Sequence, residues 1–155
     1  MGLVDDPTGN TLTYQIIGAA MAVHNRLGPG YKEEIYERAL ANECGQSGLC
    51  VAQQVPIPVC DLGLEVGLFY LDLLVESVVV VEVKAFSHLL TGDEIAQVIN
   101  YLTATDLKVG LLINFGRRKP EFNRIFPPKN PRNPKHRFGR DNVLKKNLPD
   151  PNEPR

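Results

Sequence analysis

The sequence is poor in the residues that commonly build redox, zinc and membrane sites: it has no tryptophan, two methionines, three histidines and three cysteines in 155 residues. Cys44, Cys50 and Cys60 form no C-x-x-C pair and fall one short of the four ligands of a structural zinc site, so we expect ordinary reduced thiols. No apolar run is long enough to cross a bilayer, and the first residues lack the pattern of a secretory signal. We therefore expect a cytoplasmic protein with no membrane partner.

The sequence lacks the motifs of several enzyme classes. The chain carries no glycine-rich phosphate loop, no Ser-His-Asp order and no nicotinamide fingerprint. His24 is predicted to be a packed or surface residue of a helix and not a catalytic base, whereas His88 follows Lys84 by four residues and could approach a phosphate.

The charge is unevenly distributed. Residues 1–116 hold five basic and fourteen acidic residues, a balance of −9, while residues 117–155 hold twelve basic and four acidic, a balance of +8. We expect a loose leader over residues 1–10, a folded domain over 11–126, and a basic, proline-rich tail over 127–155 that is extended or disordered. Such a tail can contact phosphates through counterion release, or it can simply be solvated chain beside an acidic body. The candidate contacts to nucleic acid in the tail are Arg132, Lys135 and Arg137.

Hydrophobic periodicity predicts three helices and four or five strands. The helices are expected over 13–27, 32–44 and 93–105, and the strands over 53–59, 64–75, 79–85, 108–114 and 122–126. In the second helix Ile35, Leu40 and the alanines are expected on the buried face. Pro56 and Pro58 confine the first strand to a sheet edge or break it. The order of elements predicts an α/β fold with a mixed sheet.

Charged residues interrupt the apolar hairpin over 64–85. Asp72 lies between two leucines, Glu82 lies between two valines, and Lys84 follows two residues later on the same face as Glu82. Buried charges are costly unless they are paired or bind a metal. A two-residue turn would place Asp72 and Glu82 on opposite faces of the hairpin, so a shared site requires an odd loop such as residues 76–78, or a bulge.

These residues are suited to a divalent cation. Asp72, Glu82 and the carbonyl of Val83 can jointly offer oxygens to Mg²⁺ or Mn²⁺, and Lys84 can position a water or help to deprotonate it. An isolated acid-x-lysine pair on a strand is usually a surface ion pair. The preceding run of valines, 78–81, disfavours that simpler interpretation here.

Two helical motifs accompany the hairpin. In Gly30-x-x-Glu33-x-x-Tyr36 the acid lies in the first turn of a helix, where it is either a further metal ligand or a residue that favours the helix dipole. Gln97 and Tyr101 are four residues apart on the third helix, so both can face Lys84 or a nucleic-acid backbone. We expect Tyr36 and Tyr101 to contribute to nucleic-acid binding.

Taken together, the motifs resemble the GxxExxY proteins of the PD-(D/E)xK nuclease superfamily. The resemblance runs from about Leu12 to Gly116, and it also rests on the segments 16–20, 54–58, 72–76, 100–102 and 110–116. It implies a restriction-endonuclease-like α-β-β-β-α-β core, a mixed sheet flanked by helices. It further implies a magnesium- or manganese-dependent nuclease site formed by Glu33, Asp72, Glu82, Lys84 and Gln97.

The chain departs from that pattern in places. The family usually has an arginine two residues before the aspartate, where this chain has Tyr70. The main hypothesis is a metal-dependent phosphodiesterase that acts on nucleic acid, with DNA as the expected substrate. The alternative is a catalytically weak or inactive nuclease-fold module that binds nucleic acid or a protein partner. The sequence leaves open DNA against RNA, endo- against exonuclease action, and the oligomeric state.

Overall fold

The part of the chain that the structure describes holds eight helices and strands, in the order α-α-β-β-β-α-β-β. The structure, a computed structural model, describes residues 10–129. The elements are α1 (Asn10–Leu27), α2 (Glu33–Gln46), β1 (Val51–Asp61), β2 (Leu64–Val75), β3 (Val79–Lys84), α3 (Gly92–Thr105), β4 (Val109–Asn114) and β5 (Glu121–Ile125). None of the helices in this part of the chain is long and apolar enough to span a bilayer.

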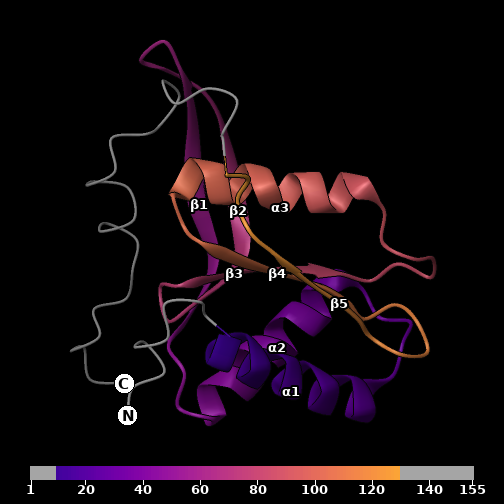
Figure 1. Cartoon of the computed structure of the whole chain (residues 1–155). Helices are drawn as coiled ribbons and strands as arrows, with labels where there is room; N and C mark the ends of the chain where they lie inside the picture. Colours follow the sequence, from indigo (N-terminus) through magenta and orange to yellow (C-terminus); the bar gives the residue numbers. More distant parts are fainter. Residues whose placement is uncertain (1–9, 130–155) are drawn as a thin grey trace.

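The strands form one mixed sheet in the order β1-β2-β3-β4-β5. Neighbouring strands are antiparallel except for β3 and β4, which are parallel and joined through α3. Helix α3 covers one face of the sheet, and α1 and α2 cover the other (Figure 1). The predicted α/β class is therefore confirmed, and β1 is an edge strand, as its prolines predicted.

Strand β3 divides its side chains between two apolar cores. Val79, Val81 and Val83 pack with α1 and α2, whereas Val80 packs with α3. Since side chains alternate along a strand, Glu82 points to the same face as Val80. Glu82 is therefore turned toward α3 and away from the core that contains α1 and α2.

The turn between β2 and β3 has an odd number of residues, 76–78. The strands pair Leu73 with Val81 and Val75 with Val79, which leaves three residues in the loop. Glu76 and Ser77 adopt left-handed backbone conformations, with φ of 52° and 58°. Glu76 exchanges hydrogen bonds with the backbone of Cys50 through its own amide and its carboxylate, which ties the turn to the start of β1.

Two helices differ from the sequence prediction. Helix α1 begins at Asn10, three residues earlier than expected. In α2 the predicted apolar face was wrong for Ile35, which is 38% exposed, while Tyr36 is fully buried. The reason is a tertiary contact: the ring of Tyr36 stacks on Phe115, with 4.8 Å between ring centroids.

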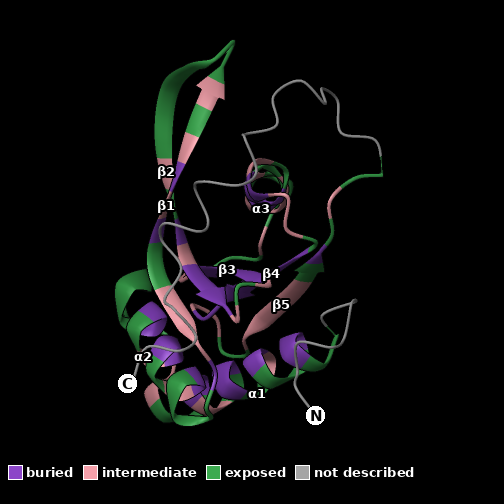
Figure 2. Ribbon diagram, turned by 90° about the vertical axis from the view of Figure 1, so that its left-hand side faces the viewer, coloured by how far each residue is buried: buried purple, intermediate pink, exposed green. Residues whose placement is uncertain are grey.

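Strands β1 and β2 continue as a two-stranded arm beyond α3 (Figure 1). The distal part of this arm is mostly exposed, whereas in its lower part, next to the helices, β2 is largely buried and β1 mixes buried, intermediate and exposed residues (Figure 2). A β-bulge interrupts the pairing between Val59 and Cys60, and Leu62 at the tip is 95% exposed. The pairing of β2 with β3, in contrast, covers only the last part of β2, so the two strands separate near Asp72.

Candidate active site

Asp72 lies where β2 separates from β3. The last backbone pair is Leu73 with Val81, and the same register would place Asp72 opposite Glu82. Residues directly opposite one another in an antiparallel pair share a face. The carboxylate of Asp72 reaches across the gap and accepts a hydrogen bond from the backbone N–H of Val83, with 2.9 Å between Oδ2 and N.

Glu82 and Lys84 form a buried ion pair. Nζ of Lys84 is 3.1 Å from Oε1 of Glu82, and Glu82 is 4% exposed. Burial, followed by the nearby charge of Asp72, raises the pKa of Glu82 from 4.5 to about 8, although Lys84 opposes the shift. Burial by itself would lower the pKa of Lys84, but Glu82 outweighs it, so the pKa of Lys84 is raised. Lys84 is therefore held as a cation at neutral pH.

The second oxygen of Glu82 has no partner. Its Oε2 atom is buried and makes no hydrogen bond within the described residues. A buried carboxylate oxygen without a donor is unfavourable because it loses its hydration with no compensating bond. The position is therefore suited to a cation or a proton.

Burial also raises the pKa of Asp72. The Val83 N–H, Lys84 and the side chain of Gln54 act in the opposite direction and favour the ionised carboxylate. Asp72 thus has donors on both of its oxygens, whereas Glu82 has a hydrogen-bond partner on one oxygen alone within residues 10–129.

Glu33 approaches the same group of charges from the first turn of α2. The pKa of Glu33 is raised, mainly because of burial and also because of the charge of Asp72. Lys84 and a hydrogen bond with the backbone of Ala85 partly oppose this rise. A pocket of about 630 Å³ opens here, between the start of α2 and the ends of the strands, and Asp72 and Gln54 line it together with Glu33. The structure thus brings three predicted carboxylates and Lys84 into one electrostatic neighbourhood, while their chemical roles stay predictions.

Gln97 and Tyr101 lie beside this group on α3. The Gln97 side chain donates a hydrogen bond to the Tyr101 hydroxyl, and the Tyr101 ring stacks on Phe69 with 4.5 Å between centroids. Burial, and then the charge of Glu82, raise the pKa of Tyr101 to about 12. Gln97 is therefore held by Tyr101, and its predicted contact with Lys84 is absent from the hydrogen bonds of the described residues.

The expectation that Tyr36 binds nucleic acid needs correction. Tyr36 is fully buried, its hydroxyl donates to the carbonyl of Gly28, and that hydroxyl accepts from the N–H of Tyr31. These bonds close the loop before α2. Tyr36 therefore helps to position Glu33 through the backbone, and its side chain is not available to a substrate. Tyr101 is also largely buried, at 7% exposure.

Sequence reasoning missed Glu37 and Gln54. Glu37 lies one turn after Glu33 on α2, is 7% exposed, and accepts a 2.8 Å hydrogen bond from the Gln54 side-chain amide. Burial raises the pKa of Glu37, and the bond from Gln54 lowers it. The four-residue spacing from Glu33 was a signal that could have identified Glu37.

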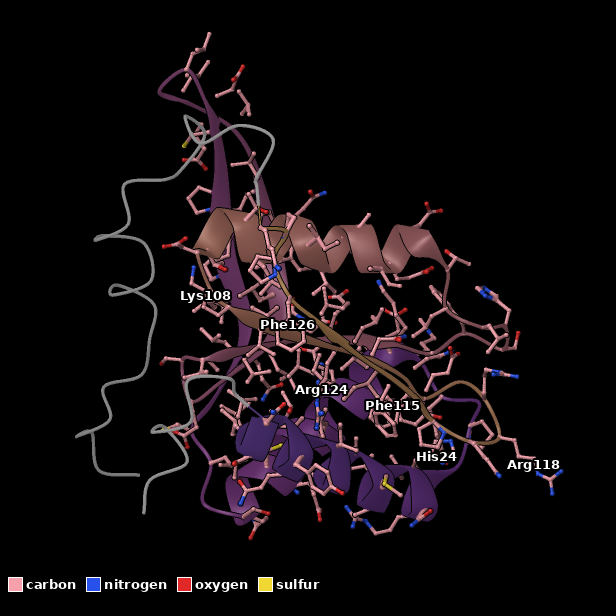
Figure 3. All side chains as sticks on the ribbon, viewed as in Figure 1. His24, Lys108, Phe115, Arg118, Arg124 and Phe126 are labelled. Carbon is pink, nitrogen blue, oxygen red and sulfur yellow. The ribbon has the colours of Figure 1, made fainter. Side chains whose placement is uncertain are left out.

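Other candidate residues lie elsewhere. His24 is buried beside Phe115, and its Nε2 lies 2.8 Å from the carbonyl oxygen of Arg117 (Figure 3). His88 is exposed and stacks on Phe86. The proposed nucleic-acid contacts Arg132, Lys135 and Arg137 lie outside the described residues.

The donor set fits a divalent cation by its chemistry. Within residues 10–129 no three side chains of His, Cys, Asp or Glu are grouped as a metal cluster. The predicted set also included Glu33, which is therefore not grouped with Asp72 and Glu82 as a third acidic ligand. Asp72, Glu82 and the Val83 carbonyl still offer oxygens, and Mg²⁺ keeps several waters besides its protein ligands. The unpartnered Oε2 of Glu82 is the atom that such a cation would satisfy.

Comparison with known proteins identifies the family of the chain. The family model of the PD-(D/E)XK nuclease superfamily matches residues 10–125, which includes every helix and strand described above. No curated protein and no solved structure matches the chain. Since the match covers most of the sequence, the chain belongs to the PD-(D/E)XK nuclease superfamily.

Proposed function

We propose that this protein is a metal-dependent phosphodiesterase that hydrolyses nucleic acid, with DNA as the expected substrate. The observation that carries the proposal is the Glu82 carboxylate, buried beside Asp72 and Lys84 with one oxygen lacking a partner among the described residues. A buried acid beside a lysine adds little to the stability of a core, because the loss of hydration offsets their attraction. Membership of the nuclease superfamily supports the same interpretation.

Asp72, Glu82 and the Val83 carbonyl would hold Mg²⁺ or Mn²⁺. When bound, the cation supplies a more acidic water and neutralises charge that develops on the phosphate. The hydrogen bond from the Val83 N–H fixes Asp72 against β3, so both acids are presented from adjoining strands. Such preorganisation avoids reorganising the site during the reaction.

Lys84 would act as a positively charged positioning group. Its raised pKa keeps Nζ protonated at neutral pH, so it donates hydrogen bonds and does not accept a proton in that state. A cation placed on Glu82 would release Lys84 from part of its pairing, and its Nζ could then donate to a phosphate oxygen or to the attacking water. Gln97, held by Tyr101, would bound the site on the α3 side.

Binding of nucleic acid is proposed to depend on the basic part of the chain. The first 116 residues carry a balance of −9, which repels a polyanion. Arg132, Lys135 and Arg137 are the proposed contacts, because each phosphate that a basic residue neutralises releases counterions. We propose a cytoplasmic location, and the free thiols of Cys44 and Cys60 are compatible with it.

An inactive nucleic-acid- or protein-binding module is the second candidate. The observation that favours it is Tyr70, which is 49% exposed at the position where the family usually has an arginine. Loss of that cation removes a phosphate contact close to Asp72. Such a module would bind nucleic acid or a protein partner without turnover.

The test is cleavage of supercoiled plasmid, single-stranded DNA and RNA in Mg²⁺ or Mn²⁺, with EDTA as the reference. We expect cleavage that requires the cation and disappears in Lys84→Ala. The matched control is Lys108→Ala, because Lys108 has an exposed side chain paired with Asp106 far from the acids. Binding of all three nucleic acids with no cleavage in either metal would favour the second candidate.

A further inference from the structure

We propose that Gln54 is a positioning residue of this site, which fixes the carboxylate of Asp72 from the side of α2 so that Asp72 and Glu82 can bind a cation together. This inference rests on the proposed function for its metal site, and it gives a role to Gln54, which begins the segment 54–58 but is not among the predicted site residues. It is carried by the contacts of the Gln54 side chain and by the conformation of its backbone.

One amide nitrogen of Gln54 lies between two carboxylates. Its Nε2 donates to Oε1 of Glu37 at 2.8 Å and makes a longer contact of 3.4 Å with Oδ1 of Asp72. The other oxygen of Asp72 accepts from the Val83 N–H. Asp72 is therefore restrained at one oxygen by β3 and at the other by β1, which limits rotation of the carboxylate plane.

The backbone of Gln54 is in an unusual conformation. Its φ is 49°, in the left-handed region that residues other than glycine, asparagine and aspartate seldom occupy. Around it, Gln53 pairs with Leu73 and Val55 pairs with Leu71, whereas Gln54 and Asp72 are missing from the register between them. Strand β1 thus leaves the regular ladder at Gln54, where the Gln54 side chain turns toward Glu37 on α2.

Strained backbone persists when its surroundings hold it, and such positions concentrate at functional sites. Here the surroundings include Glu37, whose carboxylate is 7% exposed and accepts a hydrogen bond from Gln54. A glycine would adopt the same backbone without strain. The presence of glutamine at this position therefore indicates that its side chain is needed.

A neutral donor suits this position. A lysine or arginine at position 54 would pair with Asp72 and compete with a bound cation, and a glutamate would add a further negative charge beside two carboxylates. The amide satisfies Glu37 and orients Asp72 without changing the charge of the site. Groups that orient metal ligands in this way typically affect metal affinity by about 10-fold to 100-fold.

The experiment compares Gln54→Ala, Gln54→Gly and the control Gln53→Ala in the full chain. Gln53 is the neighbouring exposed glutamine of the same strand. Two quantities are measured for each protein: the melting temperature without metal, and the Mn²⁺ affinity from the rise in melting temperature during a Mn²⁺ titration.

If Gln54 is a positioning residue, the Mn²⁺ affinities of the variants should not follow their melting temperatures. We expect Gln54→Gly to melt higher than Gln54→Ala, because glycine tolerates the left-handed backbone. Both Gln54 variants should nevertheless lose about tenfold or more in Mn²⁺ affinity, and Gln53→Ala should stay within about twofold of the original protein. A purely structural role would make affinity follow the melting temperature, so that Gln54→Gly would bind Mn²⁺ better than Gln54→Ala.

The results distinguish this inference from the proposed function. If the original protein binds Mn²⁺ but cleaves no nucleic acid, the proposed function fails, and the affinities of the variants still decide the role of Gln54. If the protein is an active nuclease and both Gln54 variants bind Mn²⁺ as tightly as Gln53→Ala does, the positioning role is overturned. A chain that binds no Mn²⁺ would overturn both.

Discussion

Glu82 should make the stability of the metal-free protein fall as the pH rises. Its carboxyl group is 4% exposed, with Oε1 3.1 Å from Lys84 and Oε2 without a partner among the described residues. Burial and the charge of Asp72 raise its pKa from 4.5 to about 8. Between these two values the folded chain keeps a proton on Glu82 that the unfolded chain has lost.

The size of the effect follows from proton linkage. Because the folded state holds one proton more than the unfolded state, the free energy of unfolding falls by about 1.4 kcal/mol for each unit that the pH rises. Between pH 5 and pH 8 this amounts to about 4 kcal/mol. Asp72 and Glu33 have raised pKa values and act in the same direction. The raised pKa of Lys84 lies above 10.5, so the stability that Lys84 contributes is lost only beyond this range.

The assay is urea unfolding in EDTA at pH 5, 6, 7 and 8 for the original protein, Glu82→Gln and the control Glu65→Gln. Glu65 is an exposed glutamate of the β2 arm. We expect the original protein and Glu65→Gln to lose about 4 kcal/mol over this range, and Glu82→Gln to lose less than half as much. Parallel curves for Glu82→Gln and the original protein would refute the reasoning.

Two further changes test the packing and the tail. A Cβ on Gly116 would lie 2.4 Å from the carbonyl carbon of Ala85, so Gly116→Ala should destabilise the fold by about 1–3 kcal/mol and disturb the end of β3. A Cβ on Gly18 in α1 would meet nothing within 4 Å, so Gly18→Ala should stabilise the fold by about 1 kcal/mol. Thermal unfolding measures both changes. Replacing the three proposed tail contacts by glutamine should weaken DNA binding and flatten its dependence on salt, and an unchanged slope would mean that they touch no phosphate. Those contacts are Arg132, Lys135 and Arg137.

Much of the fold was predictable because local patterns determine it. The run of valines predicted that the acid of β3 is buried, and the requirement that Asp72 and Glu82 share a face predicted either an odd turn such as 76–78 or a bulge, of which the structure has the odd turn. The turn itself carries no glycine or asparagine. Its left-handed residues are held by Glu76 and Cys50, a contact over 26 residues that spacing does not encode.

The missed features are all tertiary. Tyr36 replaces Ile35 on the buried face of α2 because Phe115, far along the chain, supplies the stacking partner. Gln54 meets Glu37 only after β1 has packed beside α2, so its left-handed backbone has no local signal. Sequence patterns thus indicated which strands carry the acids, while the side chains that orient them depended on contacts between distant elements.

The most direct test of the central claim is anomalous diffraction from crystals grown with Mn²⁺. The account predicts one strong peak coordinated by oxygens of Asp72 and Glu82 and by the Val83 carbonyl, with Lys84 next to it and the peak lost in Glu82→Gln. A peak held by other residues, or crystals at saturating Mn²⁺ with no peak between these two acids, would contradict it.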